Sequence, residues 1–262
     1  MRNIKPEMKE EPYFGTEEIS EIESGSLSLR PIHPYIISGG EVTERWYFDH
    51  LKNCSKYKFR IKPDFFGNES LYIEKFQKYI NEILSGSPDA KIYCVFDWDT
   101  IYDNSTCQEK HKIFEQNLSE KISNGSVVLC PSMPCIEYWF LLHFVNEVSL
   151  FRKCGSVVKI LNQYMRSYFP DQKPSKDSKR EMINVPYLRK VKLGHILKNA
   201  DYLENIEWVK KLCEDGKLET AIERAKENIK NAQISGSLNS QSYSFVFLPF
   251  LNYDADTSVS GV

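Results

Sequence analysis

The sequence lacks any long apolar run. None of its 262 residues belongs to a stretch approaching the roughly 20 apolar residues that a membrane-spanning helix needs. Its first residues, Met-Arg-Asn-Ile-Lys-Pro, are not followed by the apolar core of a signal peptide. We therefore expect a cytoplasmic protein that has no membrane partner.

Paired cysteine motifs are also missing. The cysteines number seven, which is odd, and no two of them show CxxC spacing. This pattern disfavours a zinc site and predicts reduced thiols, with those in apolar runs acting as packing residues. The cysteines are Cys54, Cys94, Cys107, Cys130, Cys135, Cys154 and Cys213.

A strong overall charge is missing as well, but one segment is basic. The formal net charge of −2 does not by itself suggest nucleic-acid binding. Residues 152–200, however, carry twelve basic and three acidic side chains, interleaved with aromatic residues. Such a segment suits a nucleic-acid backbone with unstacked bases, and a solvated helical face with a lysine-rich loop at 173–180 stays open as the alternative. The candidate nucleic-acid contacts are Lys173, Lys176, Lys179, Arg180, Arg189, Lys190 and Lys192.

Strand-like and helix-like patterns alternate along the first half of the chain, and no internal repeat is found. This alternation favours an α/β fold with a mostly parallel sheet. The predicted strands are 33–38, 58–62, 91–96 and 127–130, and the helices between them are 44–53, 71–84 and 107–122.

Composition divides the chain into four predicted segments. The residues 245–251 in the last segment are apolar and should dock as an edge strand or against a partner. The segments are an acidic, flexible N-terminal arm at 1–30, an α/β core at 31–150, a basic helical extension at 151–235 and a C-terminal tail at 236–262.

Two carboxylates follow the most apolar predicted strand. Asp97 and Asp99 come directly after Ile92–Phe96, a run that reads as a strand buried on both faces. Open α/β sheets bind ligands at the carboxyl ends of such strands, and Mg²⁺ takes oxygen ligands. A local turn role for the aspartates stays open. A haloacid-dehalogenase phosphatase is disfavoured, because Thr100 directly follows Asp99 and the strand is not the first.

The second informative stretch, 132–146, predicts a buried helix. It opens with Ser-Met-Pro, residues that often start helices, and is then apolar nearly all round. Trp139 and Phe140 should lie in the core, and Glu137, in the first turn, suits the positive end of the helix dipole. For His143 a hydrogen-bonded core position is favoured over a catalytic role.

Three motifs occur in a fixed order along the chain. They are Gly40-Glu-Val-Thr-Glu44-x-x-Tyr-Phe, Val-Phe-Asp97-x-Asp99 and Ser132-x-Pro-Cys-x-Glu137-x-Trp-x-Leu-Leu-His-Phe144. Together they resemble the RloB-like family over roughly residues 33–146. A weaker echo follows at Ala221-Ile-x-x-Ala-Lys226.

The resemblance implies a fold and a setting. The family is similar to Toprim nucleases and to abortive-infection proteins, and is associated with bacterial phage defence, often beside an ABC-type or AAA ATPase. It implies a Toprim-like α/β fold, with a mostly parallel four-strand sheet between helices, a C-terminal helical extension and one acidic site at the strand ends. The family's first-strand signature usually reads Glu-Gly-Glu-x-Thr-Glu. Here Gly39 replaces the first acid, while Glu41 and Glu44 remain.

Two hypotheses of function follow. The first is a metal-dependent nuclease effector of an anti-phage system that cleaves RNA, tRNA included, or DNA, with a partner ATPase. The second, motivated by Gly39, is a catalytically silent nucleic-acid-binding or sensor subunit; the oligomeric state stays open. Mg²⁺ or Mn²⁺ would be held by Asp97, Asp99 and Glu41. The candidate catalytic residues are Glu41, Glu44, Asp97, Asp99 and Glu137.

Overall fold

The computed structural model describes residues 33–40, 42–62, 73–165, 203–236 and 238–256. Its elements alternate strand and helix up to β4, as the sequence pattern predicts. In chain order they are β1 (Tyr35–Ser38), α1 (Thr43–Cys54), β2 (Arg60–Lys62), α2 (Ile73–Gly86), β3 (Ile92–Asp97), α3 (Asp99–Tyr102), α4 (Ser105–Asn117), α5 (Ser119–Ser123), β4 (Val127–Met133), α6 (Ile136–Leu142), α7 (Cys154–Met165), α11 (Glu207–Cys213), η2 (Glu214–Gly216), α12 (Lys217–Ser235), η3 (Leu238–Ser240), β5 (Tyr243–Ser244), α13 (Leu248–Leu251) and α14 (Tyr253–Asp256).

The sheet has the order β2-β1-β3-β4-β5, with its first four strands parallel and β5 antiparallel to β4. The α/β class and the mostly parallel sheet are confirmed. The expected number of four strands is wrong, because residues 243–244 pair with the end of β4 and add a fifth. The parallel register brings the carboxyl ends of β1, β3 and β4 to the same edge.

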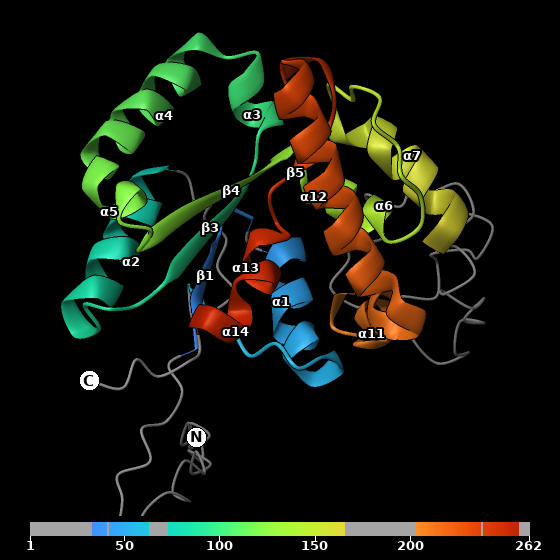
Figure 1. Cartoon of the computed structure of the whole chain (residues 1–262), viewed down its shortest axis with the longest axis horizontal. Helices are drawn as coiled ribbons and strands as arrows, with labels where there is room; N and C mark the ends of the chain where they lie inside the picture. The colour runs from blue at the N-terminus through green and yellow to red at the C-terminus, as the bar shows by residue number, and fades with distance from the viewer. Residues whose placement is uncertain (1–32, 41, 63–72, 166–202, 237, 257–262) are drawn as a thin grey trace, which may run out of the picture. The chain divides into compact units, whose positions relative to one another are not determined.

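Helices cover both faces of the sheet, and each face has its own core (Figure 1). Successive strand residues point to opposite faces. On β3, Tyr93 and Val95 pack in the core shared with α1, α6 and α12, whereas Cys94 and Phe96 pack in the core shared with α2 and α4. The strand β3 is buried from Ile92 to Phe96. Because both of its faces are covered, polar and apolar residues do not alternate along it.

Helix α6 is buried at all seven positions, as its all-round apolar sequence predicts. Trp139 and Phe140 are both 0% exposed, and the indole Nε1 of Trp139 donates a hydrogen bond to the Tyr47 hydroxyl of α1 at 2.9 Å. The predicted start at Ser132 is wrong. That residue still belongs to β4, since its backbone pairs with Asp97 of β3 and its hydroxyl lies 2.8 Å from that of Ser244 in β5.

The C-terminal elements complete the core around α6. Trp208 of α11 lies against Phe140, with ring centroids 5.4 Å apart, and Arg224 of α12 donates a hydrogen bond to the Leu142 carbonyl oxygen at 2.7 Å. Phe250 stacks on Trp139 at 5.5 Å. The apolar segment 245–251 therefore docks inside this chain: α13 forms within it, and the edge strand β5 ends just before it.

None of the helices in the described ranges is both long and apolar enough to cross a membrane.

Candidate functional site

Strand β3 carries two aspartates to the edge where the parallel strands end. Asp97 is its last residue, and the backbone N–H of Ile136 donates a hydrogen bond to Asp97 Oδ1 at 2.9 Å. The backbone N–H of Asp99 donates to the Pro134 carbonyl oxygen at 3.0 Å. The segment after β3 is thus held against the segment that joins β4 to α6.

Glu44 reaches the same edge from the first turn of α1. Its side chain is only 5% exposed. A Cβ atom added at Gly40 would collide with the Glu44 carboxylate, so this carboxylate lies directly over the glycine backbone. A glycine is needed at position 40 because any side chain there would occupy the space of the Glu44 carboxylate.

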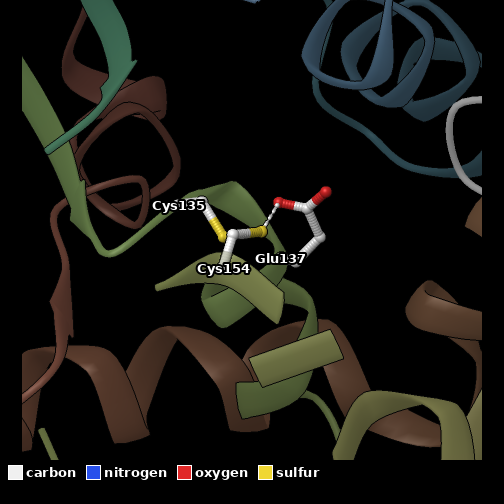
Figure 2. Close-up of side chains that lie close together, drawn as sticks. All are labelled: Cys135, Glu137 and Cys154. Carbon is white, nitrogen blue, oxygen red and sulfur yellow. Dashed lines mark hydrogen bonds between the residues drawn. A yellow bond between two sulfur atoms is a disulfide. The ribbon is translucent and has the colours of Figure 1, made fainter. Parts of the chain in front are cut away.

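Glu137 comes from the first turn of α6 and is 4% exposed. Its Oε2 lies 3.1 Å from the sulfur of Cys154, the first residue of α7 (Figure 2). The peptide N–H groups at the start of a helix favour a negative charge there, which helps a helix start to accept a buried carboxylate.

The charges of three acids act on Asp97. Burial raises the pKa of Asp97 well above its usual range, and the negative charges of Glu44, Glu137 and Asp99 raise it further. The hydrogen bond from the Ile136 N–H offsets part of this rise in pKa. We call these four residues the acidic cluster. Carboxylate oxygens are the ligand type that a hard divalent cation prefers.

Of the five candidate catalytic residues, Glu44, Glu137 and Asp99 thus lie near enough to Asp97 for their charges to act on it. The fifth, Glu41, lies outside the described residues, so its place in the ligand set stays a prediction. The nucleic-acid contacts proposed between Lys173 and Lys192 also lie outside the described residues.

Comparison with known families now adds to this geometry. A family model described as RloB-like protein matches residues 35–247, which is most of the chain and includes the whole acidic cluster. The chain belongs to the RloB-like family. This result confirms the resemblance that the three motifs predicted. No curated protein and no solved structure matched the chain.

Gly39 of this RloB-like protein stands where the resemblance leads one to expect an acid. Its backbone N–H donates to the Val95 carbonyl oxygen at 2.6 Å, and a Cβ atom added to it would lie 3.0 Å from the Cβ of Phe96. A larger residue would push β1 away from β3. In this chain the close approach of the two strands leaves little room for a side chain at position 39.

His143 is the buried core histidine that the sequence favours. Its Nδ1 lies 3.0 Å from the Trp139 carbonyl oxygen, and burial lowers the pKa of His143 to about 3. A neutral imidazole follows from this shift at ordinary pH. Within the described part of the chain, Nε2 has no hydrogen-bond partner.

The expectation that all the cysteines are reduced is wrong. Cys135 and Cys154 form a disulfide with their Cα atoms 5.6 Å apart, and the Glu137 carboxylate lies beside it (Figure 2). The two are separated by 19 positions in the sequence, so no short spacing pattern could have indicated the pair. They meet because α6 and α7 start next to each other in the fold.

Proposed function

We propose that this RloB-like protein is a divalent-metal-dependent nuclease that serves as an effector of bacterial anti-phage defence. The observation that carries the proposal is a buried Asp97 whose pKa is raised by burial and further by the charges of Glu44, Glu137 and Asp99. Carboxylates at the ligand edge of a parallel sheet repel one another, and a bound cation reduces this electrostatic repulsion.

The donor set supports Mg²⁺ or Mn²⁺, held by Asp97 and Asp99 together with Glu41. A bound ion of this kind supplies electrostatic stabilisation of the charge that develops on a phosphate and lowers the pKa of water. Other residues of the chain position the acids. The Ile136 N–H orients the Asp97 carboxylate, and Gly40 leaves space for the Glu44 carboxylate. Glu44 or Glu41 would accept a proton from the attacking water.

The proposed substrate is RNA, tRNA included, or DNA. The support is the excess of nine positive charges in residues 152–200, with tyrosines and a phenylalanine among them. The family resemblance also motivates an ABC-type or AAA ATPase as the partner protein. Residues 166–200 of this basic segment lie outside the described residues.

Cleavage assays test the proposal. Labelled tRNA and plasmid DNA are incubated with the protein in Mg²⁺, in Mn²⁺ and in EDTA, with and without the partner ATPase. We expect products only with metal, and none from Asp97→Asn. Asp89→Asn, an exposed acid before the other end of β3, should cleave normally. Intact substrates under every condition would contradict nuclease activity.

A second candidate function is a catalytically silent binding or sensor subunit. The close packing of Gly39 against Phe96 favours it, because no acid occupies that position. This candidate predicts that nucleic acid binds without being cut, and that Asp97→Asn leaves its affinity unchanged. Metal-dependent products that disappear in Asp97→Asn would exclude it.

A further inference from the structure

We propose that Cys135 and Cys154 form a reversible redox site that sets the cation affinity of the acidic cluster through Glu137. This inference rests on the proposed metal site and states how cation binding there would be regulated. The disulfide joins the start of α6 to the start of α7. Neither cysteine belongs to the proposed ligand set, so the pair can change oxidation state without removing a metal ligand.

The disulfide is connected to the cluster by two short routes. Cys135 immediately precedes Ile136, whose N–H holds Asp97 Oδ1 at 2.9 Å. Cys154 faces Glu137, with sulfur and Oε2 3.1 Å apart, and Figure 2 shows the carboxylate pointing at this sulfur. Cys135 is buried and Cys154 is partly exposed, so Cys154 is the cysteine at which a thiol reagent would attack first.

Reduction changes what Cys154 can do. A dithiol reductant attacks the Cys154 sulfur as a thiolate, the S–S bond breaks, and a mixed disulfide forms. The reductant's second thiolate then displaces Cys154, so two electrons and two protons end on the cysteines and the reductant leaves as its own disulfide. The Cys154 thiol now carries a proton that it can donate to Glu137 Oε2, whereas the disulfide sulfur has none.

The donated hydrogen bond should weaken cation binding. A hydrogen bond donated to Glu137 stabilises its negative charge, so this charge gains less from a nearby cation. The oxidised protein, in which sulfur lone pairs face Glu137, should bind the cation more tightly. The expected ratio is about fivefold, which is the size that one hydrogen bond supports.

Calorimetric titration of Mn²⁺ tests the inference in the full chain. Oxidised protein and protein reduced with a dithiol, dithiothreitol, are freed of reagent, and their thiols are counted by mass spectrometry. We expect affinity about fivefold weaker after reduction, and the same ratio in Cys54→Ser, which changes a partly exposed free cysteine. Equal or tighter binding after reduction would overturn the redox coupling alone, whereas no binding in either state would overturn the metal site as well.

Two substitutions at Cys154 separate the hydrogen bond from the covalent tether. Cys154→Ala has neither, so it should bind Mn²⁺ as tightly as the oxidised protein even in reductant. Cys154→Ser keeps a hydroxyl donor without the disulfide, so it should bind weakly in both conditions. Identical affinities of the two variants would show that Glu137 does not transmit the effect, and would overturn the proposed route.

Discussion

The two sides of α6 differ in how they treat buried polar atoms. On the core side, the indole N–H of Trp139 is buried and paired with the Tyr47 hydroxyl. On the strand-end side, Glu137 is buried, and the pKa of Asp97 is raised by its own burial and by the charges of Glu137 and two other acids. One short helix thus contributes stability on one side and repulsion on the other. Substitutions on the two sides should therefore change the stability of the metal-free protein in opposite directions.

The largest expected effect is on the core side. Trp139→Ala removes a fully buried indole and should lower the free energy of unfolding by about 3–5 kcal/mol. Ile113→Ala on α4 is the control, because that side chain is 47% exposed and should change stability by roughly 0.5 kcal/mol or less. Urea denaturation measures both. A loss at Trp139 as small as that of the control would show that α6 is not a packed core helix.

The next effect concerns the strand-end side. Gly40→Ala places a Cβ atom where the Glu44 carboxylate lies, so that carboxylate must shift away from its present position. We expect Mn²⁺ affinity to fall about tenfold, or ~1.4 kcal/mol, because one carboxylate is displaced. Gly86→Ala is the matched control, since a Cβ atom there meets no atom within 4 Å. Unchanged affinity in Gly40→Ala would separate Glu44 from the metal site.

A smaller effect appears in the pH dependence of stability. Because the pKa of Asp97 is raised on folding, the folded protein binds more protons than the unfolded chain once the pH exceeds the ordinary carboxylate range. Without metal, stability should fall as pH rises from that range through the raised pKa. Asp97→Asn removes this fall and should be more stable than the wild type near neutrality, as urea denaturation across a pH series would show.

His143 makes stability depend on pH in the opposite direction, so its contribution must be separated from that of Asp97. Its pKa of about 3, against the usual 6.5, means that stability is lost as pH falls from 6.5 toward 3. Both proteins share this residue, so the difference in unfolding free energy between Asp97→Asn and the wild type isolates Asp97. We expect the difference to grow with pH. A difference that stays constant from acid to neutral pH would contradict a raised Asp97 pKa.

Buried strands and helices could be predicted from the sequence, because a short run of residues determines them. The apolar run of β3 followed at once by Asp97, and the all-round apolar α6, predicted both a buried strand end and a buried helix. The two-residue strand β5 was missed because its pairing with Met133 joins distant parts of the chain. The Cys135–Cys154 bond was missed for the same reason, since only the packing of α6 on α7 brings the sulfurs together.

The smallest expected effect extends the comparison to the basic segment. Reversing the charges of Lys176, Lys179 and Arg180 should flatten the dependence of log affinity for nucleic acid on log salt, by about one unit for each phosphate that is no longer neutralised. Lys112→Glu, an exposed residue of α4, should leave the slope unchanged. Filter binding across a salt series measures both. An unaltered slope in the triple variant would favour the solvated-face interpretation of residues 152–200.

The melting temperature in Mn²⁺ or Mg²⁺ tests the acidic cluster most directly. A cation that binds only the folded protein stabilises it by mass action, by about 2.7 kcal/mol at 100 times Kd. The wild type and the control Asp89→Asn should therefore melt at a higher temperature with metal, and Asp97→Asn combined with Asp99→Asn should show no rise. A rise of equal size in that double variant, or none in the wild type, would contradict a metal site at the ends of β1, β3 and β4.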